Sequence, residues 1–205
     1  MANKFSSILG PLISDRRGVA AIEFALIAPL MLAMCLVTWE LALAIETSRK
    51  VGRAGSMIGD LVTQSPQMSK AELKGILAIS SSAIQPYNRS DPNITVTAIE
   101  ITNETTPKTK ILWEYKLVGK SDGQNVYEAG RAPGSLTDVP DKLETAGSFL
   151  IEVNSHLDYV PVIVWSTDAK QALGLTSSRA TYNMNETYYM RPRVTNAIAC
   201  SDCYS

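Results

Sequence analysis

A long apolar run near the N-terminus restricts what this chain can fold into more than any other feature. The run extends from Val19 to Ile45, directly after the polar approach of residues 15–18, DRRG. Its 27 residues would rise about 40 Å as a helix, whereas a bilayer core needs only about 20 residues. The segment therefore predicts a membrane-spanning helix with length to spare.

One carboxylate, Glu23, lies inside the apolar run, five residues after Gly18. An ionised carboxylate in a membrane helix is costly unless a partner pairs with it. The plainer reading is a carboxylate that the positive end of the helix dipole stabilises by about 0.3–1 kcal/mol. Because Glu23 lies shortly after a glycine and a basic pair, we favour the interpretation in which a partner pairs with its charge.

The residues Gly18, Val19-Ala20-Ala21-Ile22 and Glu23-Phe24 resemble the class III, or type IV prepilin-like, signal of pilins and pseudopilins. More narrowly, RRGVAAIEFALIAPLMLAM followed by WELALA is similar to the TadE-like pseudopilins of the tight-adherence (Tad/Flp) type IV pilus system. In that family a proline and a second glutamate follow the motif, and Pro29 and Glu40 occupy those places here.

The resemblance implies a processing step and a role in assembly. A prepilin peptidase would cut between Gly18 and Val19, and Val19, Glu23 and Phe24 would then take part in subunit assembly. The carboxylate of Glu23 would pair with the new α-amino group at Val19 of a neighbouring subunit. The function implied is that of a minor pseudopilin in the assembly of an adhesive Flp-type pilus.

The resemblance also implies partners and a location. The partners are the prepilin peptidase, the Tad inner-membrane platform with its ATPase acting through it, the Flp pilin, other pseudopilins and membrane lipid. Basic residues flank the apolar run equally on both sides, so the charge rule for membrane orientation does not decide. The family's peptidase acts on the cytoplasmic side, which implies a single-pass protein of the bacterial inner membrane with its C-terminal domain periplasmic or extracellular, or within the pilus.

An alternative function stays open. The chain would then be a single-pass membrane-anchored envelope protein whose exported domain binds a ligand or a cell-wall component, with Glu23 incidental. Formal net charge is −1, from 19 basic and 20 acidic residues, so no concentrated basic charge predicts a nucleic-acid partner. The sequence contains no P-loop, G-x-S-x-G or H-E-x-x-H motif, and we expect no enzyme, no cofactor and no metal site.

The order of elements predicts an α+β fold, with a long N-terminal helix, a second helix and a small antiparallel sheet. We expect a leader over 1–18, the transmembrane helix over 19–46, a helix extension over 47–64 and an exported domain over 65–205. A stripe of Gly52, Gly55 and Gly59 in the extension indicates a face where another backbone comes close, with local flexibility during assembly as the alternative. Ser69 and Glu72 form a capping box that begins the second helix, which runs to about Ile84.

Alternation of apolar and polar residues predicts the strands. We expect strands at Ile94–Ile101, Lys110–Val118 and from Phe149 to Leu157, and a last strand at Leu175–Tyr189 that precedes Arg191-Pro192-Arg193. Gly119 to Gly134 is predicted to be a connection, and Pro140–Ala146 a short helix. Pro161 argues against a central strand in the apolar run that follows it.

The tail carries Cys200-Ser201-Asp202-Cys203. A redox C-x-x-C motif usually opens a helix in a βαβ unit, which is not predicted here, and a zinc site would need two more ligands. A local disulfide between Cys200 and Cys203 in an oxidising compartment is the favoured interpretation, with free thiols as the alternative.

Overall fold

The computed structural model describes residues 17–162 and 181–204 and confirms the α+β fold. Helix α2 (Arg17–Thr63) contains the whole apolar run and continues through Pro29 to a point just before Ser65-Pro66. By contact density the chain divides into two units, residues 1–43 and 44–205. The last turns of α2, from Ala44 to Thr63, therefore belong to the second unit.

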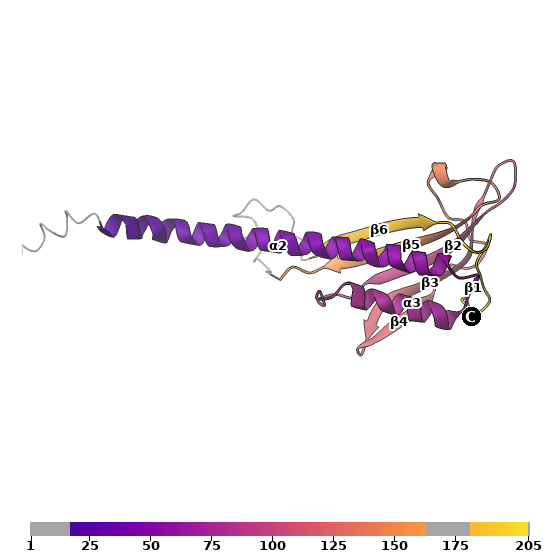
Figure 1. Cartoon of the computed structure of the whole chain (residues 1–205), viewed down its shortest axis with the longest axis horizontal. Coiled ribbons are helices and arrows are strands. Elements are labelled where there is room, and N and C mark those ends of the chain that lie inside the picture. The colour runs from indigo at the N-terminus through magenta and orange to yellow at the C-terminus, as the bar shows by residue number, and fades with distance from the viewer. Residues whose placement is uncertain (1–16, 163–180, 205) are drawn as a thin grey trace, which may run out of the picture. The chain divides into compact units, whose positions relative to one another are not determined.

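The second unit is built on one antiparallel sheet (Figure 1). Its strands stand in the order β4-β3-β2-β5-β6. Their bounds are β2 (Asn93–Ile101), β3 (Thr109–Ser121), β4 (Gln124–Ala129), β5 (Phe149–Tyr159) and β6 (Tyr182–Met190). A two-stranded parallel pair, β1 (Gln67–Met68) and β7 (Ala199–Cys200), lies outside this sheet.

One face of the sheet carries the main core. The last turns of α2 and helix α3 (Lys70–Ala83) both pack on it, and in Figure 1 the two helices run in front of the strands. Trp113 and Val153 are fully buried there, opposite Leu77 of α3. The predicted capping box is present, because Ser69 and Glu72 each accept from the other's backbone.

The opposite face of the sheet is more polar. Its apolar part is a small cluster of Ile99, Ile101 and Leu150 that the connection between β4 and β5 covers through Val139 and Leu143. This connection contains the short 3₁₀ helix η1 (Asp141–Leu143), within the predicted helical stretch. The remainder of the face carries the charged residues described below.

Two details of the predicted strands are wrong. The stretch from Gly119 to Gly134 is not only a connection, because it contains β4, and β3 extends beyond Val118 to Ser121. Asp122 and Gly123 have φ angles of 51° and 77°, as a type I′ two-residue hairpin requires. Of the predicted last strand, residues 182–189 lie in β6, and 175–180 lie outside the described residues, as does most of the apolar run after Pro161.

Candidate functional site

The residues predicted to act in processing and assembly lie at the start of α2, where side chains are exposed. Gly18 has no atom near the place where a side chain would stand. Val19 is 53% and Phe24 73% exposed, and Glu23 is exposed as well. The prediction that a peptidase and neighbouring subunits use these residues stays a prediction, because it concerns partners outside the chain.

The apolar run itself is exposed along its length. No residue of its most apolar 18-residue window is buried within the chain, and the helix is long and apolar enough to cross a membrane. Burying such a side chain fully would stabilise it by about 1.5–3 kcal/mol. An exposed apolar surface of this size indicates that lipid or other helices cover it.

The glycine stripe of α2 faces the sheet in the second unit. A side chain added at Gly52 would meet the hydroxyl of Tyr188 on β6, and one at Gly55 would meet Ser155 on β5. At Gly59 it would meet Met190 Sδ at 2.8 Å. The stripe thus allows the helix to lie close to β5 and β6.

The stretch after β6 fixes the end of α2. The backbone N–H of Arg193 donates to the carbonyl of Thr63 at 2.9 Å, and its guanidinium pairs with Asp60 Oδ1 at 2.5 Å. The carbonyls at the end of a helix have no partner within the helix. Arg193 therefore gives the predicted Arg-Pro segment a structural role, that of a remote C-terminal cap.

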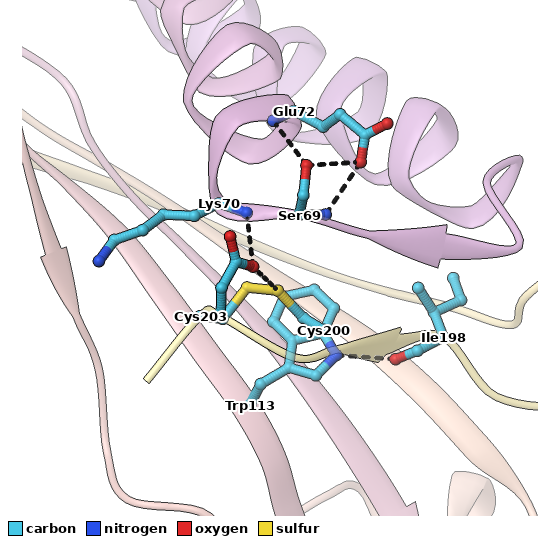
Figure 2. The surroundings of a disulfide bond; sticks show 8 residues. Ser69, Lys70, Glu72, Trp113, Ile198, Cys200 and Cys203 are labelled. Atoms are coloured by element: carbon cyan, nitrogen blue, oxygen red, sulfur yellow. Dashed lines mark hydrogen bonds between the residues drawn. A yellow bond between two sulfur atoms is a disulfide. The ribbon is translucent and has the colours of Figure 1, made fainter. Parts of the chain in front are cut away.

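The C-terminal tail forms a compact loop with two buried cysteines (Figure 2). Cys200 and Cys203 are joined by a disulfide with their Cα atoms 5.6 Å apart, and both residues are almost fully buried. Next to them, the indole N–H of Trp113 donates to the carbonyl of Ile198 at 2.7 Å. Asp202 Oδ1 accepts the backbone N–H of Lys70 at 2.9 Å.

The tail also contains a group of metal-ligand atoms, formed by Cys200, Asp202 and Cys203. Sulfur binds metal as a thiolate, and the disulfide leaves neither sulfur in that form. Within residues 17–162 and 181–204 this is the only such group identified. In its disulfide form the group offers one carboxylate, which is too few donors for a zinc site.

A buried ionic cluster, which sequence reasoning missed, lies on the polar face of the sheet. Glu114 on β3 accepts from Arg131 Nε at 2.8 Å and Nη2 at 2.7 Å, and its other oxygen lies 3.0 Å from Lys116 Nζ. Thr97 on β2 donates to the same carboxylate at 3.0 Å. Burial raises the pKa of Glu114, but the hydrogen bonds from Arg131 and Lys116 outweigh it and hold the pKa below its ordinary value.

A second carboxylate, Glu152 on β5, lies in line with Glu114 across the sheet. In the strand register Thr97 on β2 stands opposite Glu114 on one side and opposite Glu152 on the other. Burial raises the pKa of Glu152; Arg131 opposes this effect and Glu114 adds to it. Its hydrogen-bond partner Tyr189 also has a raised pKa, through burial and then through the charge of Glu152. The two carboxylates therefore differ in how well their charges are compensated.

An exposed apolar helix that runs into an α+β unit defines a class of proteins, those held in a membrane by one N-terminal helix. The family model described as TadE-like protein matches residues 18–57, which include Gly18, Glu23, Pro29 and Glu40. The resemblance expected from the sequence is confirmed over this segment, which covers 40 of the 205 residues. No match to the chain is found among curated proteins or among solved structures.

The family match bears on the function of the protein only in general terms. It is consistent with involvement in a Tad/Flp pilus system and with anchoring in a membrane by the apolar helix. The match ends at residue 57 and does not reach the sheet or the tail.

Proposed function

We propose that this protein is a minor pseudopilin that a prepilin peptidase cuts after Gly18 and that takes part in the assembly of a Flp-type adhesive pilus. The observation that carries the proposal is the TadE-like match beginning at Gly18 itself. The open surroundings of Gly18 and the exposure of Val19 support it, since a peptidase must reach the bond between them. The protein acts as a structural subunit and not as an enzyme.

The proposed topology follows from the same segment. Residues 1–18 are the leader, 19–46 span the bacterial inner membrane, 47–64 extend the helix, and 65–205 form the exported domain. The peptidase and the Tad platform with its ATPase act at the membrane, and the Flp pilin and other pseudopilins are the neighbours in the assembly. Exposure of the apolar run supports contact first with lipid and then with neighbouring helices.

In the proposed assembly Glu23 recognises the processed end of a neighbour. Cleavage creates an α-ammonium group at Val19, and Glu23 lies four residues further along, about one helical turn. Each charge is costly to bury alone in an apolar bundle, while together they satisfy each other. The pair would set the axial register between subunits, with Phe24 packing next to it.

The substitution Glu23→Ala tests this proposal. The peptidase should still cut, because Gly18 and the basic pair are intact, and the helix should stay in the membrane, because loss of a charge makes it more apolar. Assembly should fail, since an unpaired buried charge costs about 3–5 kcal/mol. We therefore expect cells that contain the processed protein in their membrane and carry no pili.

Glu46→Ala is the matched control, because it removes one carboxylate from an exposed site at the far end of the apolar run. It should leave piliation and co-purification with other pilus subunits unchanged. Wild-type piliation and wild-type co-purification by the Glu23→Ala protein would show that Glu23 is only a helix-start carboxylate.

A further inference from the structure

The C-terminal residues 198–203 hold together three parts of the second unit. Strand β7 pairs in parallel with β1, just before α3. The carbonyl of Ile198 accepts from Trp113 in the central part of the sheet, and Asp202 accepts the N–H of Lys70 at the first turn of α3. Figure 2 shows the disulfide between these two contacts.

The contact between Asp202 and Lys70 completes the cap of α3. The first four N–H groups of a helix have no partner within the helix. The hydroxyl of Ser69 accepts the N–H of Glu72, and Asp202, 132 residues further along the chain, accepts the N–H of Lys70. A carboxylate at this position also interacts favourably with the helix dipole. The start of α3 is thus held by the local capping box of Ser69 and Glu72 and by one remote carboxylate.

The disulfide fixes the loop that presents Asp202. Cys200 and Cys203 flank the aspartate, and Cys200 Sγ lies 3.3 Å from the same Oδ1 that accepts from Lys70. Opening the bond would return the backbone of this short loop to many conformations. The disulfide therefore restrains the loop in the form that places Asp202 at the start of α3.

We propose that residues 198–203 form a redox-closed latch on the N-terminus of α3, and that the disulfide is made before the latch docks. Cys200 is 3% and Cys203 0% exposed in the docked form. Thiol–disulfide exchange needs a thiolate to reach a sulfur atom directly, and the docked sulfurs offer no such access. The partner is a dithiol–disulfide oxidant of the exported compartment, which must meet the tail while it is still open.

The chemistry is an ordinary exchange in two steps. One cysteine thiolate attacks the oxidant's disulfide, forms a mixed disulfide and releases one oxidant thiolate. The other cysteine attacks the bonded sulfur of its neighbour, which forms the bond between Cys200 and Cys203 and releases the second oxidant thiolate. The two protons lost by the cysteines end on the oxidant, which is reduced to its dithiol. Once the latch has docked, its buried sulfurs are protected from the reverse reaction, in which a dithiol would reduce the bond.

The test follows reduction of the disulfide in the oxidised full-length protein by a thioredoxin-type protein reductant. Alkylation and peptide mass analysis separate the tail cysteines from the free Cys35. Asp202→Ala should be reduced about fivefold faster than the wild type, the change in open population that loss of one helix-cap hydrogen bond produces. Asp202→Asn keeps an acceptor oxygen and should be reduced at nearly the wild-type rate.

Glu104→Ala, an exposed carboxylate between β2 and β3, is the control for loss of charge and should match the wild type. Amide hydrogen exchange of the wild-type protein is the second measurement. Reduction should remove the protection of the Lys70 amide while the amide of Val96 in the centre of the sheet stays protected. Equal reduction rates for wild type and Asp202→Ala, or a Lys70 amide equally protected in both redox states, would overturn the latch. Neither measurement depends on cleavage at Gly18, so each can fail independently of the proposed function.

Discussion

Replacing a glycine by alanine in the two helices should have opposite effects, depending on what faces the glycine. Gly75 lies on the exposed side of α3, and no atom stands near its added Cβ. Gly55 lies on α2, and its Cβ would meet Ser155 Oγ, with Ser155 Cβ and Tyr188 Cδ2 each at 3.3 Å. Ser155 is 1% exposed and cannot move away into solvent.

The magnitudes follow from these surroundings. Each alanine gains about 1 kcal/mol of helix propensity over glycine. At Gly75 nothing opposes the gain, so the protein should become more stable by about that amount. At Gly55 overpacking costs about 1–3 kcal/mol, so the net effect should range from about zero to a loss of about 2 kcal/mol. A second change, Ser155→Ala, removes the hydroxyl that clashes and should restore part of the loss.

The assay is thermal unfolding of the detergent-extracted protein followed by tryptophan fluorescence. For a chain of this length about 1 kcal/mol corresponds to a shift of about 2–4 °C in Tm. We expect Gly75→Ala above the wild type, Gly55→Ala at or below it, and Gly55→Ala/Ser155→Ala above Gly55→Ala. Stabilisation by Gly55→Ala as large as that by Gly75→Ala would refute the close packing of α2 on β5.

Three further predictions concern the ionic cluster and the tail. The pKa of Glu114 is lowered on folding, so its charge stabilises the fold above its ordinary pKa. That stability is lost as the pH falls through the folded pKa. Glu114→Gln should therefore flatten the acid side of a plot of unfolding free energy against pH. The pKa of Glu152 is raised on folding, so its charge lowers stability at neutral pH. The Glu152→Gln protein should therefore have a higher Tm than the wild type at pH 7. The difference in Tm should vanish below pH 4.5, the ordinary pKa of the carboxyl group. Reducing the bond between Cys200 and Cys203 should lower the free energy of unfolding by only about 2 kcal/mol, because the loop is short; denaturant titration measures this change. Thiol labelling that finds two accessible thiols in the untreated exported domain would refute the bond.

Local sequence patterns predicted the elements whose signals are contained in a few residues. The capping box at Ser69 and Glu72 and the alternation in β2, β3 and β5 are of this kind. Strand β4 was missed because it is a short edge strand with little apolar alternation. The Asp122-Gly123 pair directly before it is a strong hairpin signal that the sequence did offer.

Contacts between distant residues could not be predicted in the same way. Arg131 and Glu114 are 17 residues apart, and Asp202 and Lys70 are 132 residues apart. Such pairs depend on how the strands align, and a charged residue in a sequence does not indicate its partner. The cluster on the polar face and the cap on α3 therefore became visible only in the folded chain.

The start of α2 is the reverse case, because the sequence says more about it than the fold does. The motif from Gly18 to Phe24 predicts a cut and an assembly contact, whereas the structure shows an exposed helix. The proposed cut and contact both involve partners outside the chain, so the geometry of one chain does not contain them. The family match over residues 18–57 covers the same segment.

The central claim is most directly tested by the mass and N-terminal sequence of the protein extracted from membranes of cells with an active prepilin peptidase. The account predicts a mature chain that begins at Val19 and lacks the first 18 residues, and a precursor that stays uncut when Gly18 is replaced by tryptophan. A wild-type protein that still begins at Met1 or Ala2 in those cells would contradict it.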